Sequence, residues 1–414
     1  MNVELTPALL NGEVEIPASK SASHRMLICA ALAKGESRLT GISMSKDIEA
    51  TMDALRAMGA TIEVKADAVY MHGVETPPDK ALLDCGESGS TLRFLMPVAA
   101  ALGLTATFTG HGKLPQRPIT PYVREFSSKG IHMDYKDTMP FAFSGQLKSG
   151  EYQLEGDISS QFISGLLFAL PLCEGESFIR LTSPLQSKPY ADMTLDALKS
   201  FGVEIVEEPE GYRIPGGQTF QSCDVKIEGD YSQAAFFYVA NALGCSIRPS
   251  NLNINSVQGD KKILEILRDM GYTENTKSAL TCFHADVGDI PDLVPILAVL
   301  GCFGREPSYI TNAARLRIKE SDRLTAIAAC LNQVGGNVEA FSDRLVIHPV
   351  EKLTGGTVDS FNDHRIVMAM AIASICSEKP ICIRDAGAVD KSYPGFFEDF
   401  NRLGGKAHVI HVEP

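Results

Sequence analysis

The feature that most constrains the fold is a phrase that this 414-residue chain repeats six times. An amphipathic segment ends in glycine and leads into a short β-like run, as in MDALRAMGATIEV and MTLDALKSFGVEIV. Glycine directly after a helix is the usual left-handed C-cap, and β-branched residues favour strands. The glycines recur at intervals of about 70 residues, at Gly59, Gly130, Gly202, Gly271, Gly336 and Gly405. Six copies at near-constant spacing predict an internal α/β repeat.

A second phrase occupies the other half of each repeat. A small polar turn opens an almost wholly apolar helix, and Ser, Asp and Asn at such positions favour N-caps. Because these helices are apolar on all sides, we expect them to be buried, whereas the amphipathic helices lie outside against a sheet. The six predicted starts lie near Ser21, Ser90, Ser160, Ser232, Asp292 and Asp363.

The repeats predict two domains of three repeats each. Parallel buried helices would bring their N-termini together at one end of each domain, where free N–H groups and helix dipoles favour anions. Two such ends facing each other would form an anion-binding cleft. Residues 207–229 carry the prolines and glycines of a turn, hairpin or hinge, and the segment Val3 to Pro17 is a second candidate hinge strand.

Composition excludes several classes of protein. The net charge of −13 argues against a nucleic-acid surface. No apolar run reaches the roughly 20 residues that span a bilayer, and the N-terminus does not resemble a signal peptide, so we expect a cytoplasmic protein without a membrane partner. The ten cysteines form no CxxC pair and the nine histidines no HExxH motif, so no metal site is expected. There is no P-loop.

One stretch, from Arg315 to Leu324, holds four cations and two carboxylates within nine residues. Lys319 and Arg323 are four residues apart, which predicts that they share a helical face beside Glu320. Glu320 could be a proton carrier or an ion-pair partner, and Asp292 a proton carrier or an N-cap. Further cations lie at the predicted helix starts and in loops, and the set suits two phosphorylated ligands: Lys20, Arg25, Arg93, Arg117, His364, Arg365 and Lys391.

The chain resembles the enolpyruvyl transferases over essentially its whole length. The segments that carry the resemblance include ASKSASHR, ESGSTLR, LPQRPI, DISSQF, SKPYADMTL, IPDLVP, RIKESDRL, NDHRIVMA and DKSYPGFF. It implies a two-domain inside-out α/β barrel of six βαβαββ repeats, three per domain, with the N-termini of the buried helices facing the cleft. The implied domains are residues 1–19 with 227–414 and residues 20–226, with hinges near 19–20 and 226–227.

The implied reaction transfers the enolpyruvyl group of phosphoenolpyruvate to the 5-hydroxyl of shikimate 3-phosphate, without metal or organic cofactor. In this family glyphosate competes for the phosphoenolpyruvate pocket. The implied catalytic residues are Asp292, Glu320 and Lys20. The residues implied to bind shikimate 3-phosphate are Lys20, Ser21, Arg25, Ser159, Ser160, Gln161, Ser187, Tyr190, Asp292 and Lys319. Those implied to bind phosphoenolpyruvate are Lys20, Gly89, Arg117, Gln161, Arg323, Arg365 and Lys391.

Two alternatives remain at this point. The first is a family branch that uses UDP-N-acetylglucosamine as acceptor. Its members usually carry a reactive Cys on the loop in which this chain has Arg117, and residues 110–121 of this chain contain no Cys. The second is a non-catalytic repeat scaffold.

The chain departs from the usual family pattern at a few positions. Many members of the family that it resembles carry Asn where this chain has His24 and Glu87, and Pro or Leu where it has Phe94; some carry Asn at the position of Arg315. We expect small anionic substrates as the only partners, and a monomer.

Overall fold

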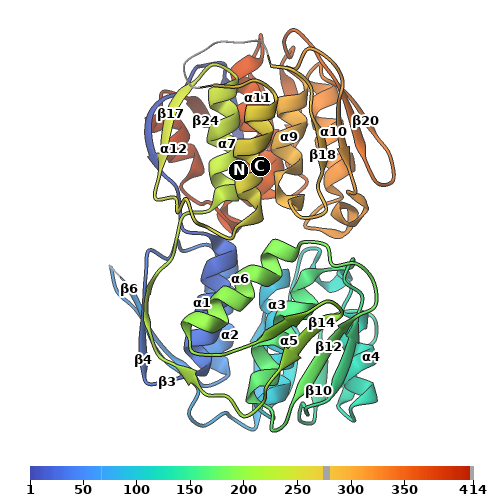
Figure 1. Cartoon of the computed structure of the whole chain (residues 1–414). Coiled ribbons are helices and arrows are strands. Elements are labelled where there is room, and N and C mark those ends of the chain that lie inside the picture. The colour runs from blue at the N-terminus through green and yellow to red at the C-terminus, as the bar shows by residue number, and fades with distance from the viewer. Residues whose placement is uncertain (67, 274–279, 411–414) are drawn as a thin grey trace. The chain divides into compact units, whose positions relative to one another are not determined.

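The computed structural model of the chain describes residues 1–66, 68–273 and 280–410. The chain divides into two units, each with its own hydrophobic core (Figure 1). Unit 1 consists of Met1–Pro17 and Gly229–Pro414, and unit 2 of Ala18–Glu228. We describe each unit by itself.

Four-stranded sheets of one topology recur through both units. The first two strands are parallel, and the remaining two are antiparallel to their neighbours. In unit 2, one sheet has the order β7 (Lys80–Asp84), β8 (Thr105–Thr109), β10 (Phe141–Ser144) and β9 (His132–Asp134). The next has the order β11 (Glu151–Leu154), β12 (Ser177–Leu181), β14 (Gly211–Ile214) and β13 (Val206–Glu208).

The third sheet of unit 2 takes its first strand from the far end of the unit's sequence. Asp224 in β16 pairs in parallel with Arg38 in β4. The strand order is β16 (Asp224–Lys226), β4 (Glu36–Thr40), β6 (Ala68–His72) and β5 (Thr61–Val64). A two-stranded parallel pair, β15 (Phe220–Gln221) with β3 (Ala33–Lys34), lies in the same unit.

Unit 1 repeats this topology and takes strands from the N-terminal segment. One sheet is β18 (His284–Asp286), β19 (Ser308–Thr311), β21 (Leu345–His348) and β20 (Asn337–Ala340). Another is β22 (Gly356–Asp359), β23 (Ile381–Arg384), β1 (Asn2–Thr6) and β24 (Lys406–Ile410). Strand β2 (Asn11–Glu15) runs parallel to β17 (Ser246–Ser250). The N-terminal segment therefore supplies one strand to each of two sheets.

The six expected buried helices are present. Most of their side chains are inaccessible to solvent, and five have a Ser or Asp N-cap whose side chain accepts a backbone N–H bond: Ser19, Ser88, Ser159, Asp230 and Asp363. The fifth helix starts from a 3-10 turn instead, so the alternative that Asp292 caps it is wrong. The helices are α1 (Lys20–Leu32), α3 (Gly89–Ala101), α5 (Ser160–Ala169), α7 (Tyr231–Ala242), α9 (Val294–Gly301) and α11 (His364–Ala373).

The six amphipathic helices are also present, namely α2 (Lys46–Ala57), α4 (Thr120–Ser128), α6 (Lys188–Ser200), α8 (Ile263–Asp269), α10 (Arg323–Gln333) and α12 (Phe396–Arg402). Positive φ angles at Gly59, Gly130, Gly202 and Gly271 confirm four predicted C-caps. At the two double glycines the prediction is wrong by one residue, because φ is positive at Gly335 and Gly404. The run after Gly271 extends into 274–279, outside the described residues.

The predicted helical face of Lys319 and Arg323 is wrong. A 3-10 turn ends at Ile318, the backbone of Lys319 is extended with φ −84° and ψ −156°, and α10 begins at Arg323. The cause is Asp322, whose side chain accepts the Thr325 N–H as an N-cap. Short 3-10 helices lie at Leu114–Gln116, Leu170–Leu172, Gly259–Lys262, Pro291–Leu293, Ala314–Ile318, Ser374–Cys376 and Ala386–Lys391.

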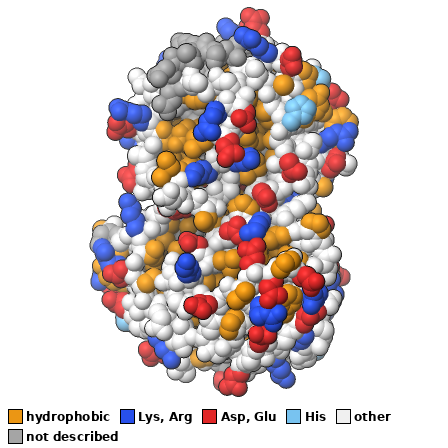
Figure 2. Space-filling view, in the orientation of Figure 1, with side chains coloured by type: hydrophobic (Ala, Val, Ile, Leu, Met, Phe, Trp, Pro, Cys, Tyr) orange, Lys and Arg blue, Asp and Glu red, His pale blue; other side chains and the backbone are white. Residues whose placement is uncertain are grey.

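The surface carries charges of both signs. Figure 2 shows Lys and Arg side chains interspersed with Asp and Glu on the visible face of each unit. Among the residues that the structure describes, no helix combines the length and the apolar character that a membrane span requires.

Candidate active site

The centre of the charged cluster in unit 1 is the guanidinium of Arg323, which is 1% exposed. Its Nε donates to Asp363 at 2.8 Å, its Nη1 to Asp292 at 2.8 Å and its Nη2 to Glu320 at 2.7 Å. Charge-assisted bonds of this length are the strongest hydrogen bonds in proteins. One buried cation therefore holds both carboxylates that the sequence selects as proton carriers.

Asp292 joins the starts of three helices of unit 1. Its second carboxylate oxygen accepts from Arg365 Nη2 at 2.8 Å, and the same nitrogen donates to Ser232 Oγ at 3.0 Å. These residues lie at the starts of α9, α11 and α7, whose N-terminal ends therefore meet. Burial would raise the pKa of Asp292, but the positive charges of Arg365, Arg323 and Lys319 outweigh it and hold that pKa well below its usual range.

Lys319 lies partly exposed beside this cluster. Removal of its ammonium from water, together with the nearby charges of Arg315 and Arg323, lowers the pKa of Lys319 to about 7, although Asp292 and Glu320 oppose the change. Arg315 is buried and donates to the carbonyl of Gly288. Near neutral pH a large fraction of Lys319 is therefore the neutral amine, which can gain a proton when an anion arrives.

The remaining predicted cation of unit 1 is Lys391, which is buried at the end of its 3-10 turn. Its Nζ donates to the carbonyl of Asn362 at 2.8 Å, in the turn that precedes α11. The next residue, Ser392, accepts from Gln233 Nε2 at 2.7 Å on the first turn of α7. Lys391 is thereby tied to the same helix starts as Arg365.

Arg25 is the central cation of unit 2, and its partners are neutral. Its Nε donates to Thr194 Oγ1 at 2.8 Å, and its two terminal nitrogens donate at 2.7 Å each to the carbonyls of Ser21 and Tyr190. The guanidinium also lies over the Phe94 ring, 5.1 Å from its centroid. Burial lowers the pKa of Arg25 to about 10, which still leaves it charged at neutral pH.

Gly89 lies at the start of α3, where the guanidinium of Arg117 packs directly on its backbone. A Cβ added to Gly89 would lie 2.5 Å from Arg117 Nη1 and 2.7 Å from its Cζ, well inside contact distance. Arg117 is itself buried, so the guanidinium has little room to yield. Glycine is therefore required here for close approach of a functional side chain.

Gln161 links the starts of α3 and α5. Its Oε1 accepts from Arg93 Nη1 at 2.7 Å, and its Nε2 donates to Ser90 Oγ at 2.9 Å. Arg93 also donates to the carbonyl of Pro118, in the loop that carries Arg117. The structure thus brings Gln161, Gly89 and Arg117 into one network.

The other predicted residues of unit 2 lie at helix starts. Lys20 opens α1 and its Nζ forms a 2.9 Å ion pair with Asp47. Ser159 and Ser160 are the N-cap and first residue of α5. Ser187 is the buried, left-handed N-cap of α6, with φ 58°. The structure does not relate Lys20 to Asp292 and Glu320, because they belong to different units.

Several residues of these clusters escaped the sequence analysis. Asp363 was identified only as a helix start, yet it anchors Arg323 and also accepts from Ser321 at 2.9 Å. Asp47, which pairs with Lys20, carried no signal beyond its place in an amphipathic helix. The acidic residue in NDHR, two positions before a selected arginine, could have been singled out. In the described ranges, no group of three or more His, Cys, Asp or Glu side chains is arranged to hold a metal ion.

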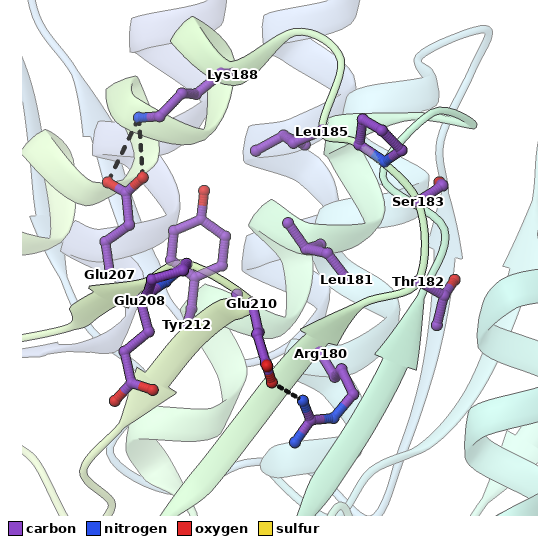
Figure 3. A pocket seen from close by; sticks show the side chains of 13 residues that line it. Arg180, Leu181, Thr182, Ser183, Leu185, Lys188, Glu207, Glu208, Glu210 and Tyr212 are labelled. Atoms are coloured by element: carbon purple, nitrogen blue, oxygen red, sulfur yellow. Dashed lines mark hydrogen bonds and ion pairs between the residues drawn. The ribbon is translucent and has the colours of Figure 1, made fainter.

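A separate open pocket of about 540 Å³ lies in unit 2, between β12, β14 and the start of α6 (Figure 3). Its charged groups are already paired: Lys188 with Glu207 at 3.2 Å, Arg180 with Glu210, and Glu208 with Arg213 at 2.6 Å. None of the predicted site residues lines it. Because its charges satisfy one another, this pocket is not the candidate active site.

Comparison with known proteins identifies the family. The sequence model of the EPSP synthase (3-phosphoshikimate 1-carboxyvinyltransferase) family matches residues 6–400. The chain is 46% identical to the 3-phosphoshikimate 1-carboxyvinyltransferase of Clostridium kluyveri, across 98% of this chain and 97% of that protein. It is 44% identical to the protein of the same name from Clostridium novyi, across 98% of both.

A solved structure extends the likeness to the fold. The EPSP synthase of Acinetobacter baumannii superposes with a TM-score of 0.82 at 28% identity, covering 99% of this chain and all of that one. This likeness confirms the predicted two-domain α/β fold class. The family match spans both units and every cluster described above, so the chain belongs to the EPSP synthase family.

Proposed function

We propose that this chain transfers the enolpyruvyl group of phosphoenolpyruvate to the 5-hydroxyl of shikimate 3-phosphate and releases phosphate, a step of aromatic amino acid biosynthesis. Membership of the family supports this reaction, since the relatives at 43–46% identity bear its name. The observation in the structure that carries it is the binding of Asp292 and Glu320 to the one guanidinium of Arg323. An anion-binding cation beside two proton carriers is what the reaction needs.

Shikimate 3-phosphate is proposed to bind the helix starts of unit 2 together with Lys319 of unit 1. Arg25 already points three donors at neutral oxygens, so a phosphate dianion can compete for them with a stronger, charge-assisted bond. The helix dipoles at the starts of α1 and α5 favour the same anion. The proposed ligands are Lys20, Ser21, Arg25, Ser159, Ser160, Gln161, Ser187, Tyr190, Asp292 and Lys319.

Phosphoenolpyruvate is proposed to bind the cations of unit 1 and the network around Gly89 in unit 2. Arginine holds carboxylate and phosphate groups with two parallel bonds, which fixes the orientation of the reacting double bond. The bare backbone of Gly89 leaves the Arg117 guanidinium in place for this purpose. The proposed ligands are Lys20, Gly89, Arg117, Gln161, Arg323, Arg365 and Lys391.

The proposed chemistry is addition followed by elimination. In the first step Asp292 takes the proton of the 5-hydroxyl, and the hydroxyl oxygen forms a bond to C2 of phosphoenolpyruvate. Glu320 gives a proton to C3, which becomes a methyl group. In the second step Glu320 removes a proton from that methyl group, the C2=C3 double bond re-forms, and the bond from C2 to the phosphate oxygen breaks. Lys20 and the arginines stabilise the departing phosphate, which takes up the proton held by Asp292.

Substrate binding would itself activate the base. The charges of Arg365, Arg323 and Lys319 lower the pKa of Asp292 and so weaken it as a proton acceptor. When phosphoenolpyruvate and the phosphate of shikimate 3-phosphate take up these cations, the positive potential at Asp292 falls and its pKa rises. Asp292 then becomes a stronger base only in the complex that contains both substrates.

Since the proposed ligands of each substrate come from both units, we propose that the units close on the substrates at the hinges predicted near residues 19–20 and 226–227. A cationic half-site on each unit favours closure only when an anion lies between them. Solution scattering with and without shikimate 3-phosphate tests this step, and identical profiles would contradict closure.

The proposed activity is tested by measuring phosphate release from the purified protein. Phosphate is expected only when phosphoenolpyruvate and shikimate 3-phosphate are both present. Release with either one alone, or none with the pair, would overturn the assignment. Replacing shikimate 3-phosphate with UDP-N-acetylglucosamine provides the control, and no release is expected with it.

We further propose that the protein works as a monomer in the cytoplasm. Light scattering tests the oligomeric state, and cell fractionation tests the location.

A further inference from the structure

A chain of hydrogen bonds crosses the interior of unit 2 from α1 to the start of α3. His24 Nδ1 lies 2.8 Å from Thr51 Oγ1, which lies 2.6 Å from Thr91 Oγ1, and Thr91 in turn donates to Ser88 Oγ at 2.7 Å. All four side chains are at most 1% exposed. The chain therefore links three helices without contact with solvent.

The protons in this chain can be assigned. Each hydroxyl has one proton to give, and Thr91 gives its proton to Ser88. Thr51 has two possible acceptors, Thr91 Oγ1 at 2.6 Å and the carbonyl of Asp47 at 3.2 Å. The shorter contact needs a proton between its two oxygens, and because that of Thr91 is already used, we assign the proton of Thr51 to Thr91. The Nδ1–H of His24 then donates to Thr51. Burial, and then the charges of Lys20 and Arg25, hold the pKa of His24 well below its usual value, so the ring is neutral and Nδ1 carries its single proton.

The other nitrogen of the ring, Nε2, indicates that the imidazole of His24 does more than fill space in the core. His24 Nε2 is buried and has no hydrogen-bond partner among the described residues. An unsatisfied buried acceptor destabilises a protein, and an apolar side chain of similar size would avoid that cost. The Nδ1 bond to Thr51 is therefore the contribution that a hydrocarbon could not make.

The two ends of the chain belong to the two proposed substrate sites. His24 lies on α1 between Ser21 and Arg25, which are proposed to bind shikimate 3-phosphate. Ser88 is the N-cap of α3, directly before Gly89, on which the Arg117 guanidinium packs. Helix α1 has other anchors, since Arg25 is bonded to Thr194 and to the carbonyl of Tyr190. The start of α3 is also held by Gln161, through Ser90 and Arg93, but this chain is what reaches its N-cap, Ser88.

We propose that His24 is a positioning residue that, through Thr51, Thr91 and Ser88, fixes the Gly89 turn and so the binding of phosphoenolpyruvate. This inference rests on the proposed function, because it assigns Gly89 and Arg117 to that substrate. His24 touches neither substrate and takes no part in proton transfer. Its effect is on the geometry of the turn that carries the binding groups.

The test is steady-state kinetics of the full chain with two variants that break the same chain at different points. His24→Leu removes the donor, and Thr91→Val removes the central hydroxyl while keeping the branched shape. Each is expected to raise KM for phosphoenolpyruvate by about 10-fold, the loss of about one buried hydrogen bond, and to change KM for shikimate 3-phosphate less than about 2-fold. His24→Asn, which keeps an N–H donor, is expected to restore most of the loss.

The double variant separates positioning from general destabilisation. If both residues act through one chain, His24→Leu with Thr91→Val should raise KM for phosphoenolpyruvate no more than either change alone. Losses that multiply would overturn the inference, as would an unchanged KM in both single variants. Ser23→Ala is the matched control, because it removes a buried hydroxyl bond to the carbonyl of Ser19 on the same helix without touching the chain.

A measurement on the unaltered protein keeps the inference testable if a variant fails to fold. Nitrogen-15 NMR of the imidazole, with the signal assigned by its loss in His24→Asn, should show the tautomer protonated at Nδ1. A ring protonated at Nε2 would contradict the direction of the chain and overturn the inference. The two proposals fail separately: no phosphate from wild type with both substrates would refute the function, whereas active wild type with unaffected variants would refute only the role of His24.

Discussion

The central buried cations of the two units, Arg323 and Arg25, are held in opposite ways. In unit 1, Arg323 is bonded to three carboxylates and Arg365 to one of the same three. In unit 2, the partners of Arg25 are a hydroxyl and two backbone carbonyls. The positive charge of unit 1 is therefore balanced from within, whereas the charge of Arg25 is solvated by neutral dipoles only.

This difference indicates how one protein can bind two anionic substrates one after the other. A guanidinium that is bonded only to neutral groups gains the full free energy of a charge-assisted bond when a phosphate binds. The Arg25 site of unit 2 therefore suits the substrate that binds first, proposed to be shikimate 3-phosphate. A guanidinium that already holds carboxylates gains less, and its occupation by a second anion releases those carboxylates to move protons. The contrast predicts that substitution of Glu320 or Asp292, the proposed proton carriers bonded to Arg323, acts mainly on turnover, whereas substitution of Arg25 acts mainly on binding.

The largest effect is expected from Glu320→Gln, which keeps the shape and removes the proton carrier. Turnover should fall by about 10³-fold or more, while the dissociation constant for shikimate 3-phosphate stays within about 3-fold, because the group acts on protons. Phosphate release and calorimetry measure the two quantities. Glu339→Gln is the control, since Glu339 is an exposed carboxylate of unit 1 that pairs with His348. Near-normal turnover in the Glu320 variant would contradict its role as a proton carrier and with it the predicted difference between the Arg323 and Arg25 sites.

The next effect should come from Arg25→Met, which keeps the apolar stem and removes the charge. Loss of the central cation of unit 2 is expected to weaken shikimate 3-phosphate binding by about 100-fold, through lost charge-assisted bonds. Calorimetric titration measures it, with the exposed Arg56→Met as control. Circular dichroism checks that the variant is folded, because the carbonyls of Ser21 and Tyr190 lose their donor. Unchanged affinity would show that the neutral environment of Arg25 has no bearing on substrate binding.

A smaller effect is expected from Gly89→Ala, which tests the close packing of the Arg117 guanidinium on the backbone of unit 2. The added methyl group would push on Arg117, so KM for phosphoenolpyruvate should rise by about 10-fold while KM for shikimate 3-phosphate changes little. Gly395→Ala is the matched control, because a Cβ there meets nothing within 4 Å and its φ is −81°. Equal behaviour of the two variants would contradict the close-approach role of Gly89.

The smallest effect concerns protons bound with the ligand. Lys319, with a pKa of about 7, is mostly neutral at pH 8, and a bound phosphate should raise that pKa. Binding of shikimate 3-phosphate at pH 8 should therefore take up as much as about one proton, with uptake vanishing below pH 6. Calorimetry in two buffers of different ionisation enthalpy measures the uptake. Lys319→Arg, whose charge does not titrate in this range, should bind without it; uptake in that variant would assign the proton elsewhere.

The lowered pKa of Lys319 also predicts how the free energy of unfolding depends on pH. The pKa of Lys319 is lowered in the folded state, so the unfolded chain binds more protons between pH 7 and the ordinary lysine value. The contribution of Lys319 to stability should therefore rise with pH across that window and stay constant at its lowest value below pH 7, where the amine is protonated in both states. The pH dependence of urea unfolding, compared between wild type and Lys319→Met, measures this contribution.

The sequence was sufficient to predict most of what depends on local chemistry. Helix caps, C-terminal glycines and the alternation of buried and amphipathic helices are set within a few residues, so the six repeats could be inferred. The two double glycines failed because either glycine can adopt a positive φ, and only the structure selects Gly335 and Gly404. The cap at Asp322 was also local, but the charge spacing of Lys319 and Arg323 pointed to a continuous helix.

Long-range partners could not be predicted from the residues alone. Asp363 lies forty residues beyond Arg323 in the sequence, and nothing in its own segment marks it as the third ligand of that guanidinium. The chain from His24 to Ser88 likewise joins residues of three helices. Such contacts follow from how the helices pack, which composition and periodicity do not specify.

The strand exchange between distant parts of the chain has a consequence for the order of folding. Unit 2 is one continuous stretch, and its last sheet is complete once β16, at Asp224–Lys226, is available to pair with β4. Unit 1 must hold β1 until β24, at Lys406–Ile410, has been synthesised, since Val3 pairs with Val409. Because pairing over such separations is slow, unit 2 should mature on the ribosome while the strands at the N-terminus wait, and unit 1 should be the last to fold.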